Sequence, residues 1–220
     1  MNMNPNGKSR LKPRRMKSAS FLVACLALGA VLSGQPLSRA ADPAAADDYE
    51  PLLAGQESVM TATIFSPQGS KRIGTGHQRV EAAALRNGKS YFRCHTWTEG
   101  WPQNLDINEM LRKEDKAIYH LDDQPNAVEA IALVLPLKVG STWSSKTSNG
   151  TMNGTVVEMQ DLTVNGKTYP KCFHIRTVAA DGAFTEDFWD APGIGTVKSD
   201  TIFKGGARVL LELNSFTPGK

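Results

Sequence analysis

Residues 164–184, VNGKTYPKCFHIRTVAADGAF, decide the fold class. They place a run rich in aromatic and β-branched residues between Asn165-Gly166 and Asp181-Gly182, two dipeptides that accept the backbone of a tight hairpin turn. Similar turn signals stand in RNGK at 86–89 and KGGA at 204–207. Four tight hairpins in one chain predict an all-β domain whose strands follow one another as a single antiparallel meander.

The same alternation of β-rich runs and turn signals continues through the chain from Pro51. It predicts strands near 58–65, 76–86, 89–98, 116–121, 129–135, 141–147, 154–164, 167–179, 183–190, 194–203 and 207–216. A minor α component is expected at NLDINEMLRK, 104–113, because Ile107, Met110 and Leu111 would share one side of a helix.

Part of the chain repeats. NGKSYFRCHT at 87–96 matches NGKTYPKCFH at 165–174, and PLLAGQESVM at 51–60 is similar to PLKVGSTWSS at 136–145. A recurring pattern of this kind indicates duplication of a structural unit. We therefore expect a divergent internal duplication, with repeats over about 51–130 and 136–216.

The N-terminus has the three parts of a secretory signal peptide: a basic stretch, an apolar run from Phe21 to Leu32, and small residues near residue 40. We predict a signal peptide over 1–40, cleavage between Ala40 and Ala41, a disordered leader over 41–50 and a single β domain over 51–220. The apolar run is shorter than the roughly 20 residues that span a bilayer, so cleavage is preferred to a membrane anchor.

Two alternatives concern this N-terminal region. Translation could start at Met16, since the sequence from there has the ordinary shape of a signal peptide. LVAC at 22–25 has the order of a lipoprotein box, and acylation of Cys25 is the less favoured alternative because the apolar run continues past it. The expected location is periplasmic or extracellular, with a lipoprotein acylated at Cys25 as the alternative.

Removal of residues 1–40 reverses the sign of the charge. That segment holds seven Lys and Arg and no acid, so the remaining chain has 18 basic and 22 acidic residues. Nucleic-acid binding, which depends on clustered positive charge, loses its support from composition. We expect no cofactor, because no nucleotide-binding motif is present.

Two cysteines remain in the exported chain, Cys94 and Cys172, in a compartment that permits disulfides. They form a candidate disulfide, and two buried thiols are the alternative. A zinc site with His95 and His174 is disfavoured, because Cys172 and His174 share a strand face whereas Cys94 and His95 do not.

Other polar residues give no catalytic motif. His77 and His120 are isolated and are expected at the surface or on edge strands. The acidic group Glu186, Asp187 and Asp190 is expected on a solvated strand face; calcium binding and glycosidase chemistry are the alternatives. The sequence thus predicts no catalytic residue and no metal site.

The phrase FWDAPGIGTVKSD, 188–200, has two glycines one residue apart and a following lysine. A phosphate-binding loop would need a further glycine and a helix after it, and the next residues are typical of a strand. Pro192-Gly193 instead fits the centre of a type II turn. We expect a corner between two strands.

Four tryptophans, Trp97, Trp101, Trp143 and Trp189, are candidates for lining a ligand cleft. Aromatic side chains also dominate ordinary β cores, so core packing is the competing interpretation.

LPLKVGSTW at 135–143 and the phrase at 188–200 together resemble uncharacterised exported bacterial β-proteins that carry PLxxGxxW and WxAPGxGxVK phrases. The matching residues are Pro136, Leu137, Gly140, Trp143, Trp189, Ala191, Pro192, Gly193, Gly195, Val197 and Lys198. This family resembles the periplasmic lipoprotein-carrier fold. The resemblance implies a strongly curved sheet or half-open barrel around an apolar cavity, and it brings no catalytic residues.

These observations favour an exported, non-enzymatic protein that binds an apolar small molecule, a lipid or an envelope partner. A hydrolase acting on envelope polymers through the carboxylates near Trp189 is the main alternative. A purely structural or adhesive module is the other.

Overall fold

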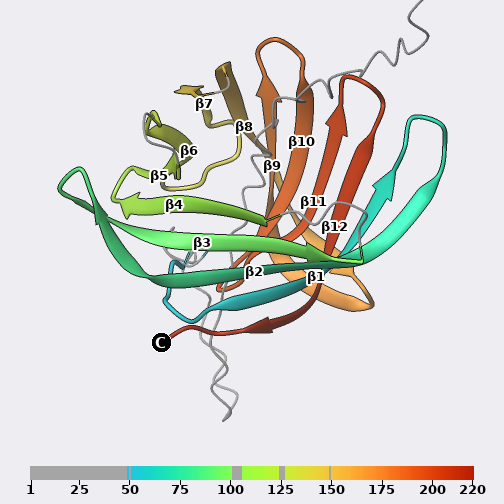
Figure 1. Cartoon of the computed structure of the whole chain (residues 1–220), viewed down its shortest axis with the longest axis horizontal. Helices are drawn as coiled ribbons and strands as arrows, with labels where there is room; N and C mark the ends of the chain where they lie inside the picture. Colours follow the sequence, from blue (N-terminus) through green and yellow to red (C-terminus); the bar gives the residue numbers. More distant parts are fainter. Residues whose placement is uncertain (1–48, 50, 101–105, 124–126, 149) are drawn as a thin grey trace, which may run out of the picture.

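The computed structural model describes residues 49, 51–100, 106–123, 127–148 and 150–220. This part of the chain folds into twelve β-strands (Figure 1). The strands are β1 (Glu57–Phe65), β2 (Lys71–Arg86), β3 (Lys89–Glu99), β4 (Asp106–Glu114), β5 (Ala117–Asp122), β6 (Ala130–Val134), β7 (Thr142–Thr147), β8 (Gly150–Val164), β9 (Lys167–Ala179), β10 (Phe184–Ala191), β11 (Gly195–Phe203) and β12 (Arg208–Thr217).

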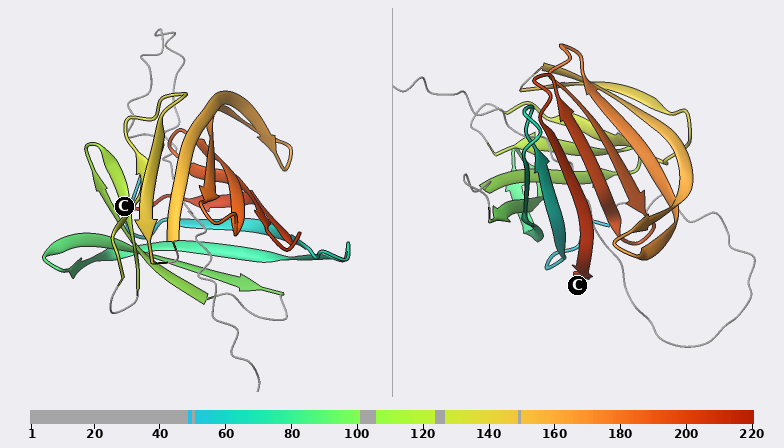
Figure 2. Two further views of the ribbon diagram at one scale, coloured as in Figure 1. Left: turned by 90° about the horizontal axis from the view of Figure 1, so that it is seen from above. Right: turned by 90° about the vertical axis from the view of Figure 1, so that its right-hand side faces the viewer.

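The strands form one antiparallel sheet in the order β6-β5-β4-β3-β2-β1-β12-β11-β10-β9-β8-β7. The sheet curls until its two edge strands, β6 and β7, lie beside each other (Figures 1 and 2). The described parts of β6 and β7 share no backbone ladder. One hydrogen bond, from the Ile131 amide to Ser145 Oγ at 2.6 Å, crosses between them. The predicted all-β meander is confirmed, as a nearly closed barrel whose seam lies between β6 and β7.

The tight turns have the predicted backbone. Asn87 and Gly88, between β2 and β3, have φ of 51° and 75°, and Asn165 and Gly166, between β8 and β9, have φ of 47° and 79°. Positive φ at both central residues is the type I′ arrangement, whose twist suits a two-residue hairpin. The local turn chemistry therefore fixes the register of the two longest hairpins.

The corner after β10 is also as predicted. Gly193 has φ of 68°, and the Ile194 amide donates to the carbonyl of Ala191 at 3.1 Å. β11 follows directly as a strand, so no helix N-terminus faces this turn.

The helix predicted over 104–113 is wrong: the described part of this segment is strand β4. Leu111 lies inside the barrel opposite His120, while Met110 packs on the other face with Tyr91 and Leu121. Both faces of this strand are therefore buried, and apolar residues on both faces produce the crowded spacing that resembles a helical stripe. The apolar stretch 127–135, in contrast, contains the predicted buried strand, β6.

Side chains from the two sides of the seam meet in the barrel interior. Ile118 and Leu133, on β5 and β6, share one apolar cluster with Val156, Ile175 and Phe188, on β8, β9 and β10. These strands flank the junction of β6 and β7, because the sheet curls until its two edge strands lie beside each other. The interior behind the seam is thus packed by the barrel's own side chains.

A second cluster seals another part of the barrel. The β8–β9 hairpin bends at two register shifts, and its tip residues Val164 and Tyr169 pack with Met60 and Leu213. Asn165 at the tip donates to the carbonyl of Leu213 at 3.1 Å. The longest hairpin of the chain is therefore anchored to β12.

The predicted internal duplication stays a prediction. It would make β1–β6 the counterpart of β7–β12, with Asn87-Gly88 and Asn165-Gly166 as equivalent turns.

Gly154 provides a test of packing at the seam. A Cβ at this position would meet Trp143 Cε2 and Cζ2 at 2.1 Å, so the indole of Trp143 would have to move. We expect Gly154→Ala to lower the free energy of unfolding by about 1–3 kcal/mol, the usual cost of overpacking, measured by urea denaturation.

Gly205→Ala is the matched control, because an added Cβ there has nothing within 4 Å. It should change the free energy of unfolding by less than about 0.5 kcal/mol. Equal effects of the two substitutions would contradict the close packing of Trp143 on Gly154.

Candidate binding site

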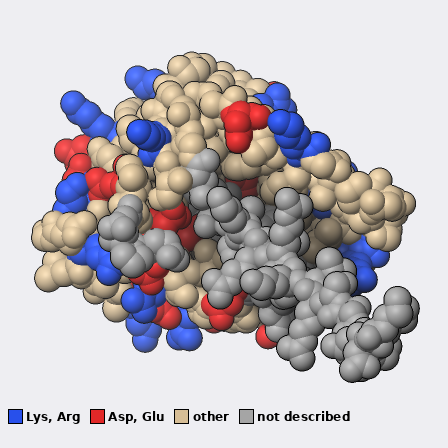
Figure 3. All heavy atoms as spheres, turned by 45° about the horizontal axis from the view of Figure 1, so that its top comes forward, with Lys and Arg blue, Asp and Glu red and all other residues tan. Residues whose placement is uncertain are grey.

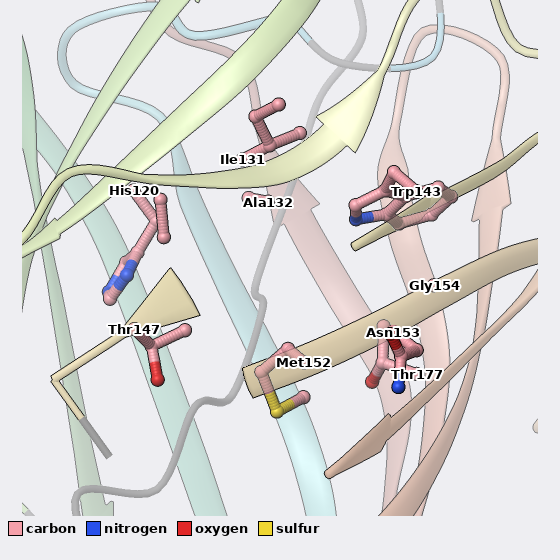
Figure 4. A pocket seen from close by; sticks show the side chains of 10 residues that line it. His120, Ile131, Ala132, Trp143, Thr147, Met152, Asn153, Gly154 and Thr177 are labelled. Carbon is pink, nitrogen blue, oxygen red and sulfur yellow. The ribbon is translucent and has the colours of Figure 1, made fainter. Parts of the chain in front are cut away.

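A small pocket lies at the seam of the barrel (Figure 4). His120 and Trp143 stand on opposite sides of it, with Ile131 from β6 on one side and Met152 from β8 on the other. Its volume is about 20 Å³, which is room for a single water-sized group. In this structure the pocket gives access to the seam of the barrel but is too small to hold a whole ligand.

Trp143 reaches this pocket because residue 154 is glycine. Trp143 on β7 is directly opposite Gly154 on β8, and its ring covers the space where a side chain would stand. Thr177 lies opposite Gly154 on the other side. The indole therefore forms one wall of the pocket, which Thr177 also lines.

Apolar side chains continue from the pocket into the barrel. Trp143 and Ala132 pack against the cluster that contains Ile118 and Leu133. Tyr49 belongs to the same cluster; its ring lies 4.7 Å from that of Phe173. Its hydroxyl donates to the carbonyl of Lys171 at 3.0 Å. A residue from just before the sheet thus fills part of the apolar interior.

The other side of the pocket leads to buried polar groups. Thr177 stands directly opposite Glu186 on β10, and the Glu186 side chain is fully buried. Glu186 Oε1 accepts hydrogen bonds from Ser199 at 3.0 Å and Thr201 at 3.4 Å. Glu186 Oε2 and Thr177 Oγ1 have no hydrogen-bond partner. The buried acid is therefore only half satisfied by the protein.

Burial raises the pKa of Glu186 to about 8. Hydrogen bonds from Ser199 and Thr201 oppose the shift, while the nearby carboxylates of Glu109 and Asp190 add to it. A carboxyl without a cation beside it is held in its neutral form in such surroundings. At neutral pH Glu186 is thus predominantly protonated.

His120 is the basic side chain among the polar groups at the pocket. Its Nε2 lies 3.7 Å from Glu109 Oε1 and 3.6 Å from Asp122 Oδ1. Burial acts to lower the pKa of His120, but the interactions with Glu109 and Asp122 outweigh it and raise the pKa. We call Thr177, Glu186, Glu109 and His120 the polar ring, since Thr177 and His120 line the pocket and Glu186 and Glu109 join them inside the barrel.

The expectation of exposed histidines is wrong for His120, which is buried on β5 facing the interior. The prediction that the acidic group lies on a solvated strand face is also wrong for Glu186 and Asp190, because both side chains are fully buried. Strand alternation explains this, because both acids share a face of β10 with the core residue Phe188.

The carboxylates proposed for hydrolysis do not come together. Asp187 points to the opposite face of β10 from Glu186 and Asp190, and binds Arg176 Nε at 2.8 Å and His174 Nε2 at 2.6 Å. The hydrolase alternative thus lacks its proposed trio of neighbouring acids.

The described candidates for lining a ligand cleft, Trp97, Trp143 and Trp189, do not lie together in one cleft. Trp143 lines the seam pocket. Trp97 stacks on His77, with ring centroids 4.8 Å apart, and faces away from the interior residues Thr96 and Thr98. Trp189 stacks on His174 at 4.7 Å, with Lys198 Nζ 4.9 Å from its ring centroid. Trp101 lies outside the described residues, as do Cys25, Ala40 and Ala41. A ligand role for these tryptophans stays a prediction.

The candidate disulfide is not formed. Cys94 and Cys172 are free thiols, each fully buried and each in a different apolar cluster. Burial raises the pKa of Cys172 to about 12, and its thiol donates to the carbonyl of Tyr169 at 3.3 Å. Both cysteines serve as small core residues.

Charged side chains are mixed over the surface. In Figure 3, Lys and Arg alternate with Asp and Glu around the visible face. Within the described ranges, no group of three or more His, Cys, Asp or Glu is placed to hold a metal ion. No helix in the same ranges has the length and apolar character needed to cross a membrane.

No protein-family model and no curated protein matches the sequence. Solved structures do show similarity. An exported protein with a YmcC-like fold from Bacteroides fragilis has 12% identity and a TM-score of 0.44, over 76% of this chain and 98% of its own. A protein described as a lipoprotein from Parabacteroides distasonis has 10% identity and a TM-score of 0.42, over 76% of this chain and 97% of its own.

A LolA superfamily protein from Nitrosomonas europaea has 7% identity and a TM-score of 0.33, over 80% of this chain and 90% of its own. At these scores the similarity carries no conclusion about ligand or activity.

Glu186 provides a test of the buried acid. Its pKa is raised above that of an unfolded chain, so the folded state binds more protons between about pH 4.5 and 8. The contribution to stability is fully present below that window and is lost as the pH rises through it. Glu186→Gln, which cannot titrate, should remove a pH-dependent loss on the order of a few kcal/mol.

Urea unfolding at pH 5 and pH 8 measures this difference. The stability of the wild type should fall more steeply toward pH 8 than that of the variant. Parallel pH profiles would show that Glu186 titrates normally and is not buried as described.

The thiols give a second test. Protein purified without reductant should show two free thiols in denaturant and almost none toward an aromatic disulfide reagent in the native state, because the reactive thiolate is suppressed by burial. Alkylation followed by mass spectrometry counts them. A mass that shows no alkylation without reductant would establish a disulfide.

Proposed function

We propose that the protein is an exported, non-enzymatic binding protein that takes an apolar ligand through the seam between β6 and β7. The observation that carries this proposal is that the seam has no ladder and is lined by Trp143 and Met152, next to the apolar core. Ligand pockets are typically apolar with a few placed polar groups, as here.

Access requires the seam to open. Separating β6 from β7 breaks the hydrogen bond from Ile131 to Ser145 but no strand ladder between them. Every other neighbouring pair in the sheet is held by a ladder of backbone bonds. The seam is therefore the least costly place for the barrel to admit a ligand.

Tyr49 occupies apolar space that such a ligand would use. It is buried among Ile118, Leu133 and Phe173, although it comes from the segment before the first strand. In this account Tyr49 fills the interior while the ligand is absent and withdraws when the ligand enters. The signal peptide and the resemblance to exported carrier-like proteins support a role in the envelope.

A neutral apolar dye such as Nile red tests the proposal. Binding should raise its fluorescence, and Trp143→Ala should weaken the affinity by about tenfold, as expected for loss of a buried aromatic anchor. Trp97→Ala is the matched control, because Trp97 faces away from the interior, and it should leave the affinity unchanged.

Tyr49→Ala provides an independent measurement. Because this substitution vacates apolar space, it should strengthen dye binding. Absence of dye binding to the wild type and to Tyr49→Ala would overturn the proposed function, and equal effects of Trp143→Ala and Trp97→Ala would overturn the location.

A further inference from the structure

We propose that the ligand of the seam pocket carries a primary ammonium group, which is held between the Trp143 ring and the polar ring. This inference rests on the proposed function and specifies the chemistry of the same site. It starts from buried polar atoms that the protein leaves without partners.

One unpartnered atom belongs to a residue that lines the pocket and the other to the residue directly opposite it on the next strand, and neither atom is exposed to the pocket as the structure stands. Thr177 lines the pocket, is buried, and has a hydroxyl without a partner. Glu186, directly opposite it on β10, is fully buried and has one carboxyl oxygen without a partner. Leaving a buried polar group unsatisfied costs about 1–3 kcal/mol. The Thr177 hydroxyl can accept a hydrogen bond, and Glu186 Oε2 accepts one when the carboxyl gives up its proton, so a cationic donor that displaces this proton would satisfy both positions.

The charges specify the sign of this ligand. Glu109, Asp122 and Asp190 surround the same interior together with Glu186, and His120 is the basic group that lines the pocket. A protonated His120 offsets one carboxylate and leaves an acidic excess. An anionic ligand would meet repulsion here, whereas a cation would favour the ionised form of Glu186.

The size and the aromatic wall specify the kind of cation. A volume of about 20 Å³ accepts a group the size of water or ammonium but not a guanidinium or a sugar. Trp143 lines the same space, and indole is the best aromatic partner for an ammonium ion. An ammonium donates three hydrogen bonds, which matches separate acceptors on Thr177 and Glu186.

The apolar remainder of the ligand would follow the seam. Ile131, Ala132 and Met152 line the pocket beside Trp143, and Ala132 and Trp143 contact the main apolar cluster. A ligand with an ammonium end and an alkyl chain therefore meets both kinds of wall.

Three probes with the same chain, octylamine, octanol and octanoate, separate this inference from the proposed function. They are titrated by calorimetry at pH 7, below their aggregation concentrations. Octylamine should bind at least about tenfold more tightly than octanol, and octanoate should bind most weakly.

Glu186→Gln should lower the ratio of octylamine affinity to octanol affinity about tenfold, since the variant keeps the shape of the side chain and cannot ionise. Glu158→Gln is the control, because Glu158 is a half-exposed acid opposite His174 and does not line the pocket. It should change neither affinity.

Proton release on binding distinguishes a charge interaction with Glu186 from a change in packing, because a change in packing alone releases no proton. Glu186 is largely protonated at pH 7, so binding of an ammonium should expel close to one proton to the buffer. Titrations in buffers of different ionisation enthalpy should detect this proton in the wild type and not in Glu186→Gln.

Each outcome is decisive. Equal affinities for octylamine and octanol, or equal proton release in Glu186→Gln, would overturn the ammonium inference and leave apolar binding intact. Binding of none of the three probes would overturn both the inference and the proposed function.

Discussion

The absence of a backbone ladder between β6 and β7 is the feature on which the rest of the barrel depends. Twelve strands curl far enough to bring β6 and β7 together, yet these strands face each other without a ladder. Exposed strand edges carry unpaired backbone groups, and a closed barrel normally removes them. Here the seam is covered by side chains instead, with Trp143 over Gly154 and Ser145 accepting from the Ile131 amide. Closure is thus achieved by packing, which is easier to reverse than a ladder.

The predicted duplication would make this seam the counterpart of a normal junction. If β1–β6 correspond to β7–β12, then the pairing of β1 with β12 and the contact of β7 with β6 are equivalent positions. The first has a backbone ladder with one register shift and the second has none. Under that prediction, only one of the two equivalent junctions would lack a ladder and be able to open.

The fold could be predicted from turn chemistry, and the site could not. Asn165-Gly166 and Pro192-Gly193 set their own backbone, so local sequence identifies them. The positions of Glu186 and His120 depend on which strand face becomes the inside, and that is decided by closure of the whole sheet. The sequence did contain one signal for the burial of Glu186. Glu186 is two residues before Phe188 on a strand, so both side chains point to the same face, and an acid on the face of a core aromatic residue is expected to be buried. The sequence does not predict β4, because both faces of this strand are buried and its apolar residues do not alternate. It does not predict the burial of Tyr49 either, because no local pattern indicates that a residue before the first strand packs inside the barrel.

Hydrogen exchange at the Ile131 amide tests the central claim most directly, because this amide donates the bond that crosses the seam. The account predicts that it exchanges through a local opening whose free energy is well below that of global unfolding, while amides in the β1–β12 ladder exchange only with global unfolding. An Ile131 amide as protected as the β1–β12 amides would contradict an opening seam.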